Sequence, residues 1–336
     1  MNKILTVSIA AYNVQDYIEN ALKSLLVNNI DDLEILVEDD GGTDNTANIV
    51  KEYEKKYPGI VKLVHKENGG YGSTVNKSIE IAQGKYFKQL DGDDWYDSQN
   101  FEKLLEVLRT IDVDVVYTPH KEFWEAKKTY VDKDFIDKNI TGRYNLEEII
   151  EKQKNYLIMH TLLYKTELLR DCKLKLLEHC FYTDTQYAMI PLVSAKTIYV
   201  LHDSIYIYRI GRKDQSISLP SHRKHYKDHV RVSKEILSFY NEQESKLDEN
   251  KRKYLFNYVK MHTGNTISGF LIVLLPSKEN LNKIKEFDNY VLNYNKKIYD
   301  AMYEQSKIVK LLRITKYNFI IYKIISKIKS KKMESE

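Results

Sequence analysis

The chain carries the stretch YFKQLDGDDW at residues 86–95. Residues 86–90 form a short, mostly apolar run that predicts a β-strand buried in a sheet. Asp91, Asp93 and Asp94 follow directly, and three carboxylates this close repel one another unless a cation or hydrogen-bond donors compensate. Such oxygen ligands suit Mg²⁺ or Mn²⁺, which bridge phosphate oxygens, and Gly92 lets a ligand approach the backbone. The alternative is an acidic turn that caps a helix beginning near Ser98.

On both sides of this stretch, strand-like and helix-like runs alternate. Strand-like runs occupy residues 4–10, 33–37, 60–64 and 113–117, and apolar residues at helical spacing occupy 18–26, 47–57, 75–82 and 101–108. This alternation predicts an α/β fold, with a mostly parallel sheet covered by helices on both faces. Sheets of this kind bind ligands at the carboxyl ends of their strands.

The alternation ends near Pro119. Residues 124–137 are charged and irregular, which indicates a loop or a hairpin, and strand-like runs return at 197–201 and 205–210. From about Ser221 the pattern is mainly helical, with no Pro/Gly/Ser-rich linker before it. We therefore predict a first domain over residues 1–220 and a helical C-terminal region over residues 221–336.

Two further motifs follow predicted strands. The sequence AAYN at residues 10–13 follows the first strand, where small residues admit a nucleobase and a tyrosine can stack on it. Asp39 and Asp40 follow the second strand, where a carboxylate can accept a hydrogen bond from an imide N–H and so select uracil over cytosine. Ordinary strand-to-helix packing, with Asp44 capping the next helix, is the alternative interpretation.

The sequence NGGYGSTVN at residues 68–76 is a glycine-rich loop that opens a predicted helix. A helix start of this kind offers backbone N–H groups to an anion. The loop matches neither the GxGxxG pattern nor the P-loop lysine pattern, so it does not support a dinucleotide or ATP site.

Composition excludes several classes of protein. The net charge of +4 does not favour a nucleic-acid partner, and the two cysteines, Cys172 and Cys180, suit reduced thiols of the cytoplasm. The N-terminus does not resemble a signal peptide, and no apolar run reaches the 20 or so residues that a membrane span needs. We expect a cytoplasmic protein.

Residues 308–332 combine many isoleucines and leucines with many lysines and arginines, and they contain no acidic residue. A basic amphipathic helix of this composition is typical of contact with the inner face of a membrane, because anionic lipid attracts each basic residue. The alternative is a helix packed on the protein with a solvated basic tail.

Over residues 5–117 the motifs occur in the order and spacing of family 2 glycosyltransferases of the GT-A fold, which the chain therefore resembles. Gly42 is a mild departure, because the family often has serine there. The resemblance implies a UDP-sugar donor and a metal cofactor, Mg²⁺ or Mn²⁺. The donor-binding residues that we assign on this basis are Ala10, Tyr12, Asp39, Asp40, Asn68, Asp91 and Gly92. Asp93 is the implied metal ligand, with Asp91 at the metal or the ribose.

The family also places a catalytic carboxylate in the second half, often in a Glu-Asp pair. Thr183 stands where glutamate often occurs, which leaves Asp184, and the alternative role for either residue is capping of the helix that follows. Arg209 and Arg212 lie in a segment that follows this base in many members. They could contact the diphosphate or an acidic acceptor, or they could be ordinary surface charges.

The resemblance implies an inverting transfer, in which Asp184 deprotonates a hydroxyl of a glycan or lipid-linked acceptor. Bacterial surface polysaccharide or cell-wall synthesis is the expected context. One rival is a nucleotidyltransferase, which would need a basic glycine-rich loop after the first strand. The other is a non-catalytic partner subunit that binds nucleotide-sugar, which would be expected to have lost the carboxylates that this chain keeps.

Overall fold

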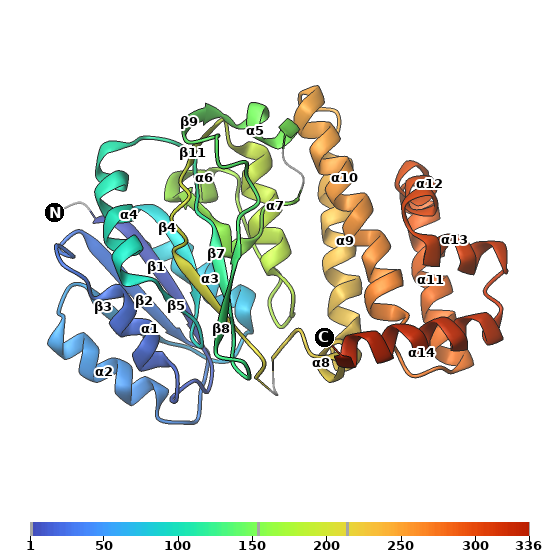
Figure 1. Cartoon of the computed structure of the whole chain (residues 1–336), viewed down its shortest axis with the longest axis horizontal. Helices are drawn as coiled ribbons and strands as arrows, with labels where there is room; N and C mark the ends of the chain where they lie inside the picture. The colour runs from blue at the N-terminus through green and yellow to red at the C-terminus, as the bar shows by residue number, and fades with distance from the viewer. Residues whose placement is uncertain (1–2, 153–154, 213–214, 336) are drawn as a thin grey trace. The chain divides into compact units, whose positions relative to one another are not determined.

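The chain forms two compact units, residues 1–212 and 213–336 (Figure 1). The computed structural model describes residues 3–152, 155–212 and 215–335. The first unit is an α/β domain and the second is helical, so the predicted fold class is confirmed.

A sheet of eight strands forms the centre of the first unit. Its order is β3-β2-β1-β4-β10-β6-β11-β9. Four parallel strands make one half: β1 (Lys3–Ala11), β2 (Leu33–Asp39), β3 (Val61–His65) and β4 (Gly84–Asp91). The other half holds β6 (Val115–Tyr117) and β11 (Thr197–Val200), parallel to each other, with β10 (Leu162–Lys165) and β9 (Gly142–Asn145) antiparallel to them. The sheet is therefore mixed, because β10 inserts antiparallel between β4 and β6.

Helices cover both faces of this sheet, as the alternation predicted (Figure 1). One face carries α1 (Ile18–Leu25), α2 (Thr46–Lys56) and α4 (Ser98–Thr110), and the other carries α3 (Tyr71–Ile81), α6 (Thr166–Asp171) and α7 (Asp184–Ser194). A short helix, α5 (Leu146–Lys152), follows β9. Apolar side chains of α4 are buried at helical spacing, and Asp97 caps that helix by accepting from the Asn100 N–H. The capping of this helix therefore falls to Asp97, outside the 91–94 turn.

A second, smaller sheet has the order β5-β12-β7-β8. Its strands are β5 (Trp95–Tyr96), β12 (Tyr206–Ile210), β7 (His120–Trp124) and β8 (Thr129–Lys133). Strands β7 and β8 form a hairpin whose turn and second strand lie in the 124–137 region, where a loop or a hairpin was predicted. Pairing of Tyr206 with Tyr96 places β12 beside the residues that follow the acidic turn.

The second unit consists of α8 (Leu219–Lys224), α9 (Tyr226–Gln243), α10 (Glu249–Asn265), a π-helix (Thr266–Leu271), α11 (Lys278–Tyr294), α12 (Lys296–Gln305), α13 (Lys307–Ile314) and α14 (Phe319–Ser335). Buried apolar side chains of α9, α10, α11 and α12 make its core. In this core, Arg313 donates from Nη2 and from Nε to the two carboxylate oxygens of Asp288, at 2.6 and 2.8 Å. Within the described part of the chain, no helix is both long and apolar enough to cross a bilayer.

Candidate functional site

Strand register brings most of the predicted site residues to one edge of the large sheet. Ala10, near the end of β1, lies opposite Glu38 of β2 on one side and Asp91 of β4 on the other. Ala11 lies opposite Asp39. The carboxyl ends of β1, β2 and β4 therefore meet, as expected for a ligand site in a parallel sheet.

Asp40 organises the glycine-rich loop. Its buried carboxylate accepts hydrogen bonds from the N–H groups of Gly69 at 2.9 Å and Gly70 at 2.8 Å, and it pairs with the Lys66 ammonium. Asn68 donates from its side chain to the Asp40 carbonyl at 2.9 Å. The two loop N–H groups are thus satisfied by a carboxylate of the protein itself, which differs from the expectation that they are free to bind an anion.

Asp39 holds the turn that follows β2. One carboxylate oxygen accepts from the Gly42 N–H at 3.1 Å, and the other lies 2.7 Å from Nδ1 of His65. A Cβ atom at Gly42 would lie only 2.7 Å from that first oxygen. Tyr12 is 53% exposed at the end of β1, so its ring is open to stack on a ligand.

The acidic turn at residues 91–94 approaches β1 closely. The Gly92 N–H donates to the Ala10 carbonyl at 3.0 Å, and a Cβ atom at Gly92 would lie 2.9 Å from the same oxygen. Asp94 is buried and accepts from the Tyr206 hydroxyl at 2.6 Å and the Arg209 N–H at 2.7 Å. Strand β12 therefore fixes the far end of the turn.

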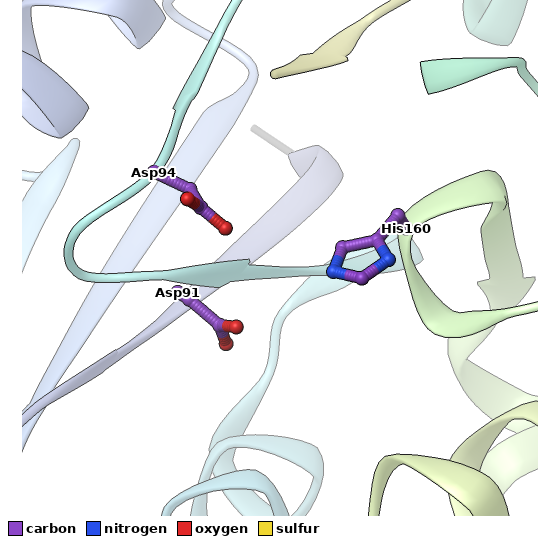
Figure 2. Close-up of side chains that lie close together, drawn as sticks. All are labelled: Asp91, Asp94 and His160. Atoms are coloured by element: carbon purple, nitrogen blue, oxygen red, sulfur yellow. The ribbon is translucent and has the colours of Figure 1, made fainter. Parts of the chain in front are cut away.

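Asp91, Asp94 and His160 form a cluster that could hold a metal ion (Figure 2). One ligand atom from each lies within 4.8 Å of the others. Among the described residues, Oδ1 of Asp91 and Nδ1 of His160 are buried without a hydrogen-bond partner. Two carboxylates and an imidazole suit Mn²⁺, and unpaired buried polar atoms are costly unless a ligand satisfies them, so the donor set fits such an ion.

The electrostatics of the cluster favour a bound cation. Burial, and then the charges of Asp93 and Asp184, together raise the pKa of Asp91 to about 8. The pKa of Asp94 is also raised, first by burial and then by Asp93 and Asp91. Burial lowers the pKa of His160, which keeps its imidazole neutral with a lone pair for a ligand. A divalent cation would offset the repulsion between the carboxylates.

His160 was not predicted from the sequence. It lies in the apolar run LIMHTLL at residues 157–163, with no ligand spacing to an acidic residue. It reaches the acidic turn because β10 pairs with β4, and because buried Lys88 donates from Nζ to its carbonyl at 3.0 Å. Its ring stacks on Tyr208 at 4.7 Å. The place of His160 beside the acidic turn follows from the antiparallel insertion of β10. The alternation of strand-like and helix-like runs in the sequence did not indicate that insertion.

Asp93 faces a different partner from the other two acids. Its carboxylate pairs with the Arg212 guanidinium, which also lies over the ring of Tyr17 at 4.6 Å. Arg209 pairs with Glu125 at 2.6 Å and donates from Nε to the Asp93 carbonyl at 2.9 Å. The two arginines thus secure the acidic turn and are not free surface charges. Ligation of a metal by Asp93 stays a prediction.

Asp184 is the first residue of α7. The residue is exposed to solvent, and desolvation by the surrounding protein raises the pKa of its carboxyl. Its charge contributes to the raised pKa of Asp91, so the two carboxylates lie near each other. Thr183, at the N-cap position of α7, makes no side-chain capping bond.

The segment before Asp184 is tied to the glycine-rich loop. Asn76 accepts from the Leu176 N–H at 2.8 Å and donates to its carbonyl at 3.0 Å. The His179 N–H donates to the Gly69 carbonyl at 2.5 Å. The loop motif therefore positions the candidate base, a connection that the sequence spacing alone did not indicate.

Gly72→Ala is expected to disturb this connection. The new Cβ atom would lie 2.1 Å from the Leu177 carbonyl oxygen, so one backbone must move, at a cost of about 1–3 kcal/mol in stability. We expect a lower Tm and weaker activity, measured by thermal unfolding and initial rates. Gly269→Ala is the control, because no atom lies within 4 Å of its Cβ position. Wild-type stability in Gly72→Ala would contradict the close packing described.

Comparison with known proteins relates this chain to a family of glycosyltransferases. The profile of the family described as Glycosyl transferase family 2 matches residues 6–172. The chain is 27% identical over 213 residues to the uncharacterized glycosyltransferase EpsJ of Bacillus subtilis, covering 62% of each chain. It is 24% identical over 274 residues to the minor teichoic acid biosynthesis protein GgaB of the same species, covering 78% of this chain and 29% of that protein.

Among solved structures, S. aureus TarS 1–349 in complex with UDP-GlcNAc superposes with a TM-score of 0.71, at 20% identity, over 96% of this chain and 90% of that one. The likeness extends beyond the first unit, since the matched share includes most of both units. The strand-end site and these matches agree: the chain belongs to glycosyltransferase family 2 and has the GT-A fold with a helical C-terminal region.

Proposed function

We propose that this glycosyltransferase is an inverting enzyme that moves a hexosyl or N-acetylhexosaminyl group from a UDP-sugar to an acceptor hydroxyl. The observations that carry the proposal are the Asp91, Asp94 and His160 cluster and the electrostatic influence of Asp184 on Asp91. Asp184 and Asp91 come from α7 and β4, and the charge of the first raises the pKa of the second. A candidate base thus lies beside a candidate metal cluster, which is the arrangement that a metal-assisted displacement needs.

The donor half of the proposed site lies at the ends of β1 and β2. Tyr12 would stack on the uracil, Ala10 would leave room for it, and Asp39 and Asp40, with Asn68, would supply its polar contacts. Asp40 also holds the glycine-rich loop, so we assign it a positioning role besides any contact with the base. The UDP-GlcNAc bound in TarS supports a UDP-sugar as the donor.

The metal half lies at the acidic turn. Asp91, Asp94 and His160 would hold Mn²⁺ or Mg²⁺, and the ion, when bound, would neutralise charge that develops on the departing diphosphate. Asp93 would join the set if Arg212 turned from its carboxylate toward the diphosphate. Gly92 would let the donor approach the backbone of the turn.

Asp184 would act on the acceptor. A carboxylate with a raised pKa is a stronger base, and its exposed side chain is open to an incoming hydroxyl. The acceptor oxygen would lose its proton to Asp184 and attack the anomeric carbon opposite the departing UDP. We assign the acceptor to a glycan or a lipid-linked glycan of bacterial surface polymers, as the likeness to GgaB supports, with the reaction at the inner face of the cell membrane.

Release of UDP tests this proposal. The full chain is incubated with UDP-glucose, UDP-galactose, UDP-GlcNAc and UDP-GalNAc, each with Mn²⁺, with Mg²⁺ or with EDTA, and with a panel of glycan acceptors. We expect UDP release from one class of donor, only with metal. Tight binding of a UDP-sugar without turnover across all acceptors would instead favour the non-catalytic partner subunit.

A further inference from the structure

The basic C-terminal segment is two helices, where the sequence suggested one. Helix α13 ends at Ile314, and α14 begins at Phe319. Lys316 and Tyr317 between them have φ of 50° and 57°, a left-handed conformation that ends the first helix. Each helix therefore has its own buried face and its own exposed face. In α14 the distribution of polar and apolar side chains between these faces is unusual.

Helix α14 packs on the second unit through a polar seam. The hydroxyls of Tyr322 and Ser326 both donate to the Leu274 carbonyl, at 3.3 and 3.1 Å. Nη2 of Arg223, in α8, donates to the Ser330 hydroxyl at 3.0 Å. Among the side chains of α14 that the structure describes, these three are the buried ones and they recur every four residues, so the packed face of the helix is rich in hydroxyls.

The opposite face of α14 exposes its isoleucines. Ile320, Ile324 and Ile328 are 67%, 51% and 65% exposed and recur every four residues, so they form one stripe along the helix. Exposed lysines alternate with them at positions 323, 327 and 331. In the part of the chain that the structure describes, none of these three lysines forms an ion pair with an acidic side chain. An aligned apolar stripe left in water is unfavourable and indicates an interaction surface.

We propose that this face of α14, called here the Ile–Lys face and made of residues 320, 323, 324, 327, 328 and 331, binds the surface of an anionic lipid bilayer. The isoleucines would enter the boundary between headgroups and acyl chains, and the lysines would contact lipid phosphates. The helix lies on the bilayer without crossing it, which agrees with its length and composition.

Charge decides between a bilayer and a second copy of the chain. The Ile–Lys face carries Lys323, Lys327 and Lys331, and residues 308–332 contain no acidic residue to balance them. Two such faces would bring lysines against lysines, which costs energy, whereas a layer of lipid phosphates is complementary. The proposal rests on the second unit alone and does not depend on the identity of the sugar donor.

Sedimentation of the full chain with lipid vesicles tests the proposal. We expect binding to vesicles of equal parts phosphatidylglycerol and phosphatidylcholine, little binding to phosphatidylcholine alone, and weaker binding at 0.5 M salt. Replacing lysines 323, 327 and 331 by glutamine should weaken binding on the order of 100-fold, because each basic residue near an anionic surface contributes roughly fivefold. Replacing the three isoleucines by serine should weaken binding to the phosphatidylglycerol-containing vesicles by at least about tenfold.

A matched control removes the same charge from another exposed face. Lys51→Gln, Lys55→Gln and Lys56→Gln on α2 should leave vesicle binding within about twofold of the wild type. Thermal unfolding checks that each variant is folded, which is expected because the replaced side chains are exposed. Equal loss in the control, or unchanged binding in both α14 variants, would overturn the proposal. The proposal would also be overturned if the wild type did not bind vesicles and instead formed a dimer in light scattering, while the serine variant was a monomer.

Discussion

Asp184→Asn is expected to lower kcat for sugar transfer by about 10²–10⁴-fold, the usual contribution of a general base. Asparagine keeps the size of the side chain and removes its basicity. Donor binding should change little, because the proposed UDP contacts lie at the ends of β1, β2 and β4 and in the glycine-rich loop, and not on α7. The measurement is the initial rate of UDP release at saturating donor and acceptor, alongside the Kd for UDP.

Asp171→Asn is the matched control for this prediction. Asp171 is an exposed residue at the end of α6, outside the site, so its rate should equal that of the wild type. Full turnover in Asp184→Asn would show that the base lies elsewhere. A loss confined to UDP binding would instead make Asp184 part of the donor site.

Asp91→Asn is expected to lower kcat/KM on the order of 10³-fold, since metal stabilisation of a leaving group is worth several kcal/mol and each 1.4 kcal/mol is tenfold. The variant keeps the shape of the side chain and removes a charge from the cluster with Asp94 and His160. Initial rates measured against Mn²⁺ concentration should show a much weaker apparent affinity for the metal.

His160→Gln separates a metal role from a general electrostatic one. It changes no charge at neutral pH, because burial lowers the pKa of His160 and keeps it neutral. We expect its Mn²⁺ requirement to rise in the same direction as in Asp91→Asn. If Asp91→Asn retained the Mn²⁺ dependence of the wild type, the cluster would not be the metal site, and Asp93 would again be the leading candidate.

The sequence was sufficient to predict the parallel half of the sheet and the edge of that sheet at which a ligand is expected to bind. Apolar runs that end in Asp39, Asp40 or Asp91 predict strands with acidic residues at their carboxyl ends. Parallel strands place these ends at one edge of the sheet, so the acids are expected to meet there. The glycines of the 68–76 loop also marked a close approach, because a Cβ atom at Gly72 would lie only 2.1 Å from the Leu177 carbonyl oxygen. These features are local in sequence, so patterns of residues can carry them.

The remaining features depend on contacts between distant segments. His160 comes beside Asp91 only because β10 inserts antiparallel next to β4. Arg212 meets Asp93 only because β12 pairs with β5. The break between α13 and α14 depends on left-handed Lys316 and Tyr317, residue types that carry no signal for that conformation. Strand order and side-chain partners of this kind are set by tertiary packing.

Calorimetric titration of the full chain with UDP, once with Mn²⁺ and once with EDTA, tests the central claim most directly. The claim is that the edge formed by β1, β2 and β4 binds a nucleoside diphosphate through a metal held at the acidic turn. We predict binding that is at least roughly tenfold, or about 1.4 kcal/mol, tighter with Mn²⁺, and loss of this difference in Asp91→Asn. Equal affinity for UDP with and without Mn²⁺ would contradict the account.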